Sequence, residues 1–325
     1  MSFIRAQALG CGHYLPERVI TNEELSKKID TSDEWIRART GIGQRHIAAE
    51  DQKTSDLGTL AAESALSAAG ISASDLDAIL VATATPDQTF PSTATRIQHN
   101  LGMTSGFAFD LQAVCAGFIY ALANANGLIL SGMADRVMVI GAETFSRILD
   151  WDDRATCVLF GDGAGAVILE RQEGTGKAAD RGVLATCLHS DGAHNRILHV
   201  SGGPSETQST GVLKMEGKEV FRHAVQKLAD VADEVMEKAG VSNNDIDWIV
   251  PHQANYRIIE STARKADVPM EKVIVTVQNH GNTSAASIPL ALSCGIADGL
   301  IKPGQLLLME AIGGGLAWGS ALMRW

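Results

Sequence analysis

The stretch QAVCAGFIYAL places Cys115 among small and apolar residues. An unpaired cysteine in such a setting is most often a buried and unreactive residue, so its type alone assigns no role. An apolar, strand-like segment, GFAFDLQ, precedes it, and a helix-like segment, CAGFIYALANANGLIL, begins with it. The unpaired N–H groups and the positive dipole end at the start of a helix favour a thiolate over a thiol. The sequence therefore predicts a nucleophile at Cys115.

Two further polar residues occupy comparable places in the second half of the chain. His252, in WIVPHQAN, follows an apolar strand-like segment, and Asn282, in NHGNTSAASIP, precedes a helix-like segment. Taken singly, the histidine favours an ordinary hydrogen-bonding role and the asparagine a turn. The ends of equivalent strands in an open α/β sheet converge on one edge, where ligands bind. We therefore expect Cys115, His252 and Asn282 to meet.

An internal repeat organises these segments. AGISASDLDAIL, from Ala69, and AGVSNNDIDWIV, from Ala239, share Ala, Gly, Ser, Asp, Asp and Ile at a constant offset of 170 positions, and Cys115 corresponds to Ala285. Apolar strand-like segments alternate with helix-like ones throughout, which is typical of an α/β fold. The repeat predicts two βαβ-type halves, residues 1–171 with the cysteine and residues 172–325 with the histidine and asparagine.

A glycine-rich turn stands near the end of each half. The first, GDGAGA from Gly161, satisfies the pattern GxGxxA of dinucleotide-binding turns. That pattern must open a helix, whereas the VILE after it is strand-like, so a tight β-hairpin is the favoured interpretation. No GK[ST] comes after the glycines, which excludes a phosphate-binding P-loop.

Composition narrows the class of protein. The chain has 325 residues, 45% of them hydrophobic, and a net charge of −11, which argues against nucleic-acid binding. No apolar run approaches the about 20 residues that cross a bilayer, so we expect no membrane association. The odd number of cysteines and the absence of CxxC pairs favour a reducing cytoplasm over a disulfide framework or a zinc site. The cysteines are Cys11, Cys115, Cys157, Cys187 and Cys294.

Histidines alone do not make a metal site. His189, His194 and His199 are spaced by five positions, which places successive residues on opposite faces of a strand and well apart around a helix. We therefore expect no bound metal.

Four motifs in a fixed order carry a family resemblance. CAGF, PHQAN, GNTSAASIP and GGGLAWGSA, together with TSDEWIRARTGI near the start, resemble the β-ketoacyl-acyl carrier protein synthase III family of thiolase-fold condensing enzymes. The resemblance implies a layered α/β/α/β/α homodimer that transfers a short acyl group, usually acetyl in the family, from coenzyme A to Cys115. Decarboxylative Claisen condensation with malonyl-acyl carrier protein then initiates type II fatty-acid synthesis. Both thioesters are substrates, and no cofactor is implied.

The resemblance also assigns roles at the reacting centre. The backbone N–H groups of Cys115 and Gly314 would form an oxyanion hole, and His252 and Asn282 would hold the enolate left by decarboxylation. Elongating relatives have a second histidine in place of the asparagine, and thiolases use a second cysteine. Asn282 therefore points to the initiating type.

The same resemblance implies the binding residues. Trp35 and Arg154 would hold the adenine of coenzyme A, with Thr31 and Arg39 nearby. Phe90 corresponds to the residue that closes the acyl pocket of the partner subunit, and a ring there implies a short, unbranched primer.

An acidic carrier protein needs a local cationic face on this acidic chain. Arg257, Arg264 and Lys265 are spaced i, i+7 and i+8, which places them on one face of a helix, and Arg222 extends the set. An ordinary solvated face remains the alternative.

Two rival functions share the reacting residues. A related synthase of a specialised polyketide or quinolone pathway would use the same cysteine, histidine and asparagine with another primer. A papain-type cysteine hydrolase also has Cys, His and Asn in this order, with 137 positions between Cys115 and His252. The sequence CG[SA]C[WY] around its cysteine is missing here.

Overall fold

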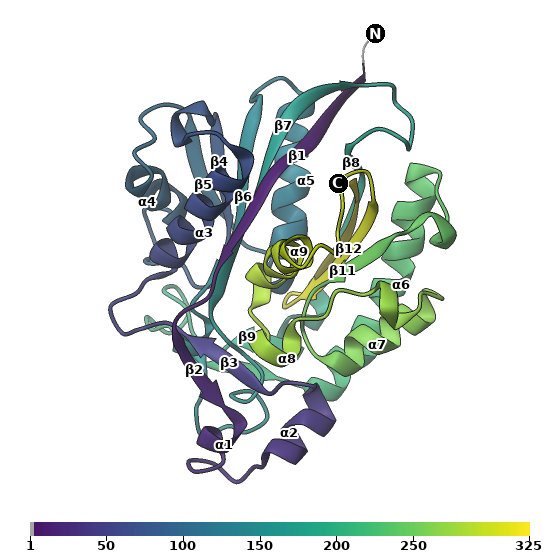
Figure 1. The fold of residues 1–325 in the computed structure, drawn as a ribbon. Coiled ribbons are helices and arrows are strands. Elements are labelled where there is room, and N and C mark those ends of the chain that lie inside the picture. Colours follow the sequence, from purple (N-terminus) through teal and green to yellow (C-terminus); the bar gives the residue numbers. More distant parts are fainter. Residues whose placement is uncertain (1–2) are drawn as a thin grey trace.

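Two β-sheets with helices between and outside them form the computed structural model of the chain, which describes residues 3–325 (Figure 1). The first sheet has the order β1-β7-β6-β4-β5 and the second the order β11-β12-β13-β8. The first comprises β1 (Phe3–Tyr14), β4 (Ala78–Ala82), β5 (Phe107–Leu111), β6 (Arg136–Glu143) and β7 (Gly163–Gly174). The second comprises β8 (Gly182–Ser190), β11 (Trp248–Pro251), β12 (Leu306–Gly313) and β13 (Ala317–Arg324).

Strand alternation sorts the buried side chains into three apolar layers. In β4, Ile79 and Val81 pack with the outer helices of the first sheet, whereas Leu80 faces the helices between the sheets. In β12, Leu307 faces those central helices and Leu308 the outer helices of the second sheet. The helices are α3 (Thr54–Ala69) and α4 (Thr93–Asn100) outside the first sheet, α5 (Gly117–Leu130) and α9 (Ser287–Ala297) in the centre, and α6 (Gly217–Ala239) and α7 (Tyr256–Lys265) outside the second (Figure 1). The predicted α/β/α/β/α layering is confirmed.

The repeat predicted from the sequence holds at the level of single residues. Strand β6 begins at Arg136 and β12 at Leu306, helix α5 at Gly117 and α9 at Ser287, each pair 170 positions apart. The strands of the first sheet end at Gly174 and those of the second begin at Gly182. The expected division after residue 171 falls inside β7, so we propose that the halves change between Gly174 and Gly182.

The sheets are mixed rather than parallel throughout. Strand β4 pairs parallel with β5 and β6, and β11 pairs parallel with β12, while the remaining pairs in both sheets are antiparallel. The GDGAGA segment leads into β7 and not into a helix, so it is not a dinucleotide-binding turn. The predicted tight hairpin is also wrong there, because residues 144–162 separate β7 from its antiparallel partner β6. Several of these intervening residues line a large cavity beside Cys115 instead.

A small peripheral unit completes the fold near the lower edge in Figure 1. It contains β2 (Arg18–Thr21), α1 (Asn22–Leu25), α2 (Asp33–Thr40) and β3 (Gln44–Ile47). Arg45 of β3 is fully buried and donates hydrogen bonds to Asn22 Oδ1 at 2.9 Å and to the Val158 carbonyl at 2.8 Å. This guanidinium therefore ties the unit that carries α2 to the main body.

The remaining elements are short. They are β9 (Leu198–Val200), β10 (Leu213–Met215), α8 (Val277–His280) and the 3-10 turns η1 (Ala73–Asp75), η2 (Val114–Ala116), η3 (Phe145–Ile148), η4 (Gly192–Ile197), η5 (Asn243–Asp245), η6 (Met270–Lys272) and η7 (Ser284–Ala286). None of the helices within residues 3–325 is both long and apolar enough to cross a bilayer. All five cysteines carry free thiols.

Candidate functional site

Cys115 lies in the turn η2, between strand β5 and helix α5, at the junction that the sequence indicates. Its side chain is buried, with 4% of its surface exposed. Gly313 at the end of β12 packs against this turn so closely that a Cβ there would lie 2.7 Å from the Cys115 nitrogen. Only glycine leaves room for the nucleophile's backbone at this point.

Burial disfavours the ionised form of the Cys115 thiol. Burial raises the pKa of Cys115 to about 12; the nearby Ser284 side chain opposes this rise, and the charge of Glu143 adds to it. This rise opposes the predicted preference for a thiolate at the start of the helix. A sulfur with so little contact with water is costly to ionise.

His252 follows β11 and is held by hydrogen bonds around it. Its backbone N–H donates to the Glu310 carbonyl at 2.8 Å, and its Nδ1 lies 2.6 Å from Ser287 Oγ. Ser287 Oγ also accepts the N–H of Gln253 at 3.2 Å, so we assign the serine's own proton to the bond with Nδ1. The ring proton then sits on Nε2. Burial lowers the pKa of His252 to about 3, so the ring is neutral.

Asn282 has an amide whose orientation is set by the next turn. Its Oδ1 accepts the backbone N–H of Ser284 at 2.9 Å, which leaves the Nδ2 group as a donor. Its backbone is clamped to the segment around Phe160: the Asn282 N–H donates to Leu159 O at 2.8 Å, and the Gly161 N–H donates to Asn282 O at 3.0 Å. Asn282 is 5% exposed.

The turn η7 links the three residues. It packs against η2, and its first residue, Ser284, lies beside the Cys115 thiol and binds Asn282. Ser287, which begins α9 directly after η7, holds His252. The two turns are equivalent in the repeat, and Val114 and Ser284 share an unusual positive φ of 48° and 50°. The turn η7 and the first residue of α9 thus connect Cys115, Asn282 and His252, and all three side chains are buried.

A cavity of about 1310 Å³ opens beside Cys115. Gly314, the proposed second oxyanion donor, lines it as well. Its apolar wall comprises Val114, Phe145, Ile148, Phe160, Leu198 and Leu213. Much of its polar rim comes from the segment 195–210, in which the sequence offers no motif, so only the structure identifies this segment as part of the site.

The residues expected to bind coenzyme A form a separate cluster that does not line this cavity. The guanidinium groups of Arg39 and Arg154 lie over the Trp35 ring, 4.7 and 5.3 Å from its centroid. Arg154 also donates to the Asp30 carbonyl at 2.6 Å. The Thr31 hydroxyl is buried and has no hydrogen-bond partner within the described chain. Two guanidinium groups over an aromatic ring suit an aromatic ligand with phosphates.

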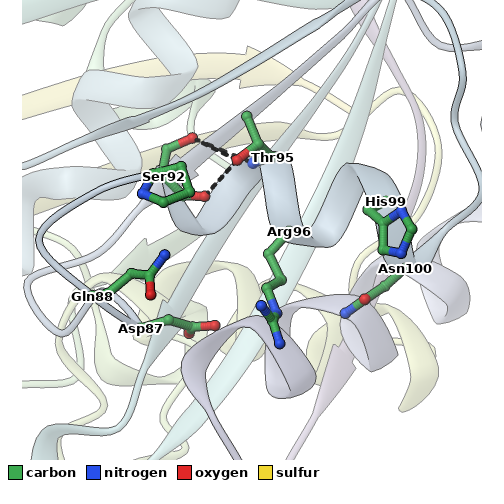
Figure 2. A pocket seen from close by; sticks show the side chains of 8 residues that line it. Asp87, Gln88, Ser92, Thr95, Arg96, His99 and Asn100 are labelled. Atoms are coloured by element: carbon green, nitrogen blue, oxygen red, sulfur yellow. Dashed lines mark hydrogen bonds between the residues drawn. The ribbon is translucent and has the colours of Figure 1, made fainter.

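Phe90 lies outside its own chain's cavity and is 83% exposed. Its loop separates two hollows, because Asp87 and Gln88 line both the large cavity and a second one of about 430 Å³ (Figure 2). Figure 2 shows the second cavity, which is also lined by Arg96, His99 and Asn100 of α4. None of the predicted site residues lines it.

The basic residues lie on the outer helices. Arg257, Arg264 and Lys265 are exposed on α7, and the Lys265 ammonium donates to Gln226 of α6 at 2.6 Å. Arg222 of α6 forms an ion pair with Glu219 at 2.6 Å, which offsets its charge. Three of the four cations thus form a face without an ion pair to a described residue.

Three residues of the cluster, Glu143, Ser284 and Ser287, escaped the sequence analysis. Glu143 ends the apolar strand β6, and a charged residue at the carboxyl end of a buried strand is a usable signal. Ser287 has no such signal, since serine is ordinary at the start of a helix. No group of three or more histidine, cysteine or acidic side chains within residues 3–325 is arranged to hold a metal.

Comparison with known proteins places this arrangement in a family. A model of 3-oxoacyl-(acyl-carrier-protein) synthase III matches residues 109–192, and the model of its C-terminal part matches residues 236–325. A curated β-ketoacyl-(acyl-carrier-protein) synthase III from Ruegeria sp. (strain TM1040) is 65% identical over 321 residues, covering 99% of each chain.

Solved structures of similar proteins lead to the same family. The 3-oxoacyl-(acyl-carrier-protein) synthase III from Aquifex aeolicus VF5 superposes with a TM-score of 0.93 at 48% identity, covering 98% of this chain and 100% of the other. The priming β-ketosynthase of the R1128 polyketide pathway superposes with a TM-score of 0.91 at 36% identity, covering 99% of this chain and 96% of the other.

Proposed function

Since this chain belongs to the β-ketoacyl-acyl carrier protein (3-oxoacyl-acyl carrier protein) synthase III family of thiolase-fold condensing enzymes, we propose that Cys115 carries the acyl group in its reaction. The chain is a condensing acyltransferase of fatty-acid synthesis that uses coenzyme A and acyl carrier protein thioesters. Family membership excludes the cysteine-hydrolase alternative, because the duplicated thiolase-like architecture is not that of papain.

In the first half-reaction, Cys115 sulfur attacks the thioester carbonyl of an acyl-coenzyme A. The oxygen of the tetrahedral intermediate accepts the backbone N–H groups of Cys115 and Gly314, and each such donor is typically worth about 10²–10³ in rate. The intermediate collapses when the bond to the coenzyme A sulfur breaks. Cys115 and Gly314 line the same cavity, which supports this assignment.

In the second half-reaction, malonyl-acyl carrier protein loses carbon dioxide, and the electron pair of the broken bond forms a thioester enolate. The enolate oxygen accepts the Nε2–H of His252 and the Nδ2–H of Asn282. The enolate carbon then attacks the acyl-cysteine carbonyl, and the Cys115 sulfur leaves. The observation that carries this assignment is the pair of bonds to Ser287 and Ser284, which leave both residues as neutral donors in a buried site.

The primer and the assembly are part of the same proposal. We infer a short primer, with acetyl-coenzyme A as the first choice, and a homodimer in which Phe90 closes the partner's acyl pocket. The exposure of Phe90, on a loop that lines the large cavity, supports such a role. Trp35, Arg39, Arg154 and Thr31 would hold the nucleotide of coenzyme A, and the protein would act in the cytoplasm without a metal or cofactor.

A specialised pathway is the second candidate function. The likeness to the priming ketosynthase of a polyketide pathway supports it, since fold and size agree throughout. The higher identity to curated fatty-acid synthases, 65% against 36%, favours the primary pathway.

Intact-mass analysis after mixing the protein with acetyl-coenzyme A tests the assignment. We expect one acetyl group on Cys115, none in Cys115→Ala, and normal acetylation in Cys187→Ala, which removes another buried thiol. His252→Ala and Asn282→Ala should still be acetylated but should lose condensation by about 10²-fold or more each. Acetylation of Cys115→Ala, or no acylation by any thioester, would overturn the proposal. Labelling only by longer acyl-coenzyme A would favour the specialised pathway.

A further inference from the structure

Cys115 must lose its thiol proton as its sulfur attacks, and His252 is poorly suited to accept it. The His252 Nδ1 is occupied by Ser287, and its Nε2 carries the ring proton. Burial lowers the pKa of His252 to about 3, so a protonated ring is strongly disfavoured. The site therefore needs another proton acceptor.

Glu143 is the carboxyl group that faces the nucleophile. It is fully buried at the end of β6, and its charge contributes to the raised pKa of Cys115. Its Oε2 accepts hydrogen bonds from Thr85 Oγ1 at 2.6 Å, from Thr83 Oγ1 at 3.2 Å and from the Ala84 N–H at 3.1 Å. Three donors on one oxygen favour the ionised form, and burial opposes it.

The repeat explains where this carboxyl points. Glu143 corresponds to Gly313, 170 positions later, and the Cα of Gly313 faces the turn η2 of the first half. Glu143 faces the equivalent turn η7 of the second half, where the Ser284 side chain lowers its pKa. In the first half, the side chain at this position thus reaches the opposing turn η7. In the second half, the opposing turn η2 leaves room only for glycine.

Ser284 lies on η7, which packs both against β6, the strand that ends at Glu143, and against the turn η2 that carries Cys115. It is fully buried and has no hydrogen-bond partner among the described residues, and it lowers the pKa of both Cys115 and Glu143. An unpaired buried hydroxyl is costly, so such a group needs an explanation. A hydroxyl that donates to one neighbour while accepting from the other can pass a proton between them.

We propose that Glu143 accepts the proton of Cys115 through the hydroxyl of Ser284 during acylation, an inference that rests on the proposed function of Cys115. As the bond from Cys115 Sγ to the thioester carbon forms, the thiol proton passes to Ser284 Oγ, and the proton of Ser284 passes to the Glu143 carboxylate. When the bond to the coenzyme A sulfur breaks, Glu143 returns its proton to Ser284 Oγ, and the hydroxyl proton of Ser284 passes to the leaving coenzyme A sulfur. Coenzyme A leaves as a thiol, and Glu143 is ionised again.

The proposed relay makes the rate of Cys115 acylation depend on pH. Burial raises the pKa of Glu143 to about 7, with Thr85, Ser284, Ala84 and Thr83 opposing the rise by their hydrogen bonds. Cys115 is the titratable group that faces it among the described residues. Below this pH the carboxyl already holds a proton and cannot accept another, so acylation is slow; above it, acylation is fast. The rate of Cys115 acylation should therefore rise with pH through about 7.

The test compares Glu143→Gln with wild type in single-turnover acetylation by acetyl-coenzyme A from about pH 5.5 to about pH 9, values chosen to bracket the expected inflection. We expect acetylation to be about 10²-fold slower at about pH 8, without the inflection near pH 7. Ser284→Ala should behave likewise, and its backbone tolerates a side chain without a hydroxyl because Val114 has nearly the same φ. Asp162→Asn is the matched control, since Asp162 is another fully buried carboxyl whose pKa is raised by burial, and its partner is Ser146.

A purely structural role for Glu143 would affect both half-reactions. We therefore also measure condensation of malonyl-acyl carrier protein by enzyme acetylated beforehand, which Glu143→Gln should leave near the wild-type rate. Wild-type acetylation rates with an unchanged pH profile in Glu143→Gln and Ser284→Ala would refute the relay. Alkylation of Cys115 by iodoacetamide supplies a readout that needs no thioester, so the relay can be judged from its pH profile even if the proposed function fails.

Discussion

At the scale of single residues, burial keeps the nucleophile and the histidine of the site uncharged. The Cys115 pKa is raised to about 12 and the His252 pKa is lowered to about 3, both chiefly by burial. Neutral donors in a site with little water interact strongly with an oxyanion or enolate, because no solvent competes and no counter-charge must be displaced. The chemistry therefore depends on which ring nitrogen and which amide atom carry the protons.

Ser287 determines which ring nitrogen of His252 carries the proton. Ser287→Ala should remove the bond to Nδ1 and allow the other tautomer, so we expect condensation to slow by about tenfold, the equivalent of one hydrogen bond. Acetylation of Cys115 should be unaffected, because His252 takes no part in that step. Nitrogen NMR shifts of the His252 ring in the two proteins check the tautomer directly. Equal ring shifts and equal condensation rates would contradict the assignment.

At the scale of elements, two equivalent turns set the distance between the halves of the site. Each turn packs against the end of the partner half's central strand. Gly313 abuts η2, and Gly141 of β6 abuts η7, where a Cβ would lie 2.2 Å from the Ala285 carbonyl oxygen. A contact between two backbones leaves nothing flexible to move aside, so the sequence must supply glycine at both strand ends.

Gly141→Ala tests this requirement. The new methyl group should push η7 away from β6 and lower the free energy of unfolding by about 1–3 kcal/mol. Gly127→Ala is the control: it lies exposed in α5, a Cβ there meets no atom within 4 Å, and alanine should stabilise the helix by about 0.5–1 kcal/mol. Chemical denaturation measures both, and equal effects of the two substitutions would mean that the strand ends are not tightly packed.

At the scale of the whole molecule, charge is the property that limits partners. With a net charge of −11 the chain repels an acidic protein at long range, so we propose that a carrier protein docks on the cations of α7. Arg264 and Lys265 end that helix and also complement its negative dipole end. The same residues thus serve helix stability and the proposed docking.

Arg264→Glu together with Lys265→Glu should lower kcat/KM for malonyl-acyl carrier protein by about tenfold at low ionic strength and by less in high salt. Acetylation by acetyl-coenzyme A should keep its rate, because the Trp35 cluster is elsewhere. Lys302→Glu changes an exposed lysine before β12, at the opposite end of that strand from Gly313, and serves as the control. A loss of activity equal to that of the control variant would place the docking face elsewhere.

Most of the architecture can be predicted from sequence patterns that are local or periodic. The 170-residue offset, the alternation of apolar strands and helices, and the motif order predict the duplicated layered fold, because burial of each strand and helix face depends on that periodicity. The positions of Cys115, His252 and Asn282 at element ends are predictable for the same reason. The path of the chain at Gly161 is not, since a glycine-rich segment indicates a turn but says nothing of residues 144–162 between the paired strands.

Protonation states and the residues behind the nucleophile are decided only by the tertiary structure. The sequence predicts a thiolate from the local helix end, whereas the folded chain buries the sulfur and opposes that preference. Glu143 and Ser284 lie 141 positions apart, and only the packing of β6 on η7 brings them to Cys115. Local pattern fixes which elements form, while desolvation and long-range contact fix what their side chains can do, because both depend on every layer packed around them.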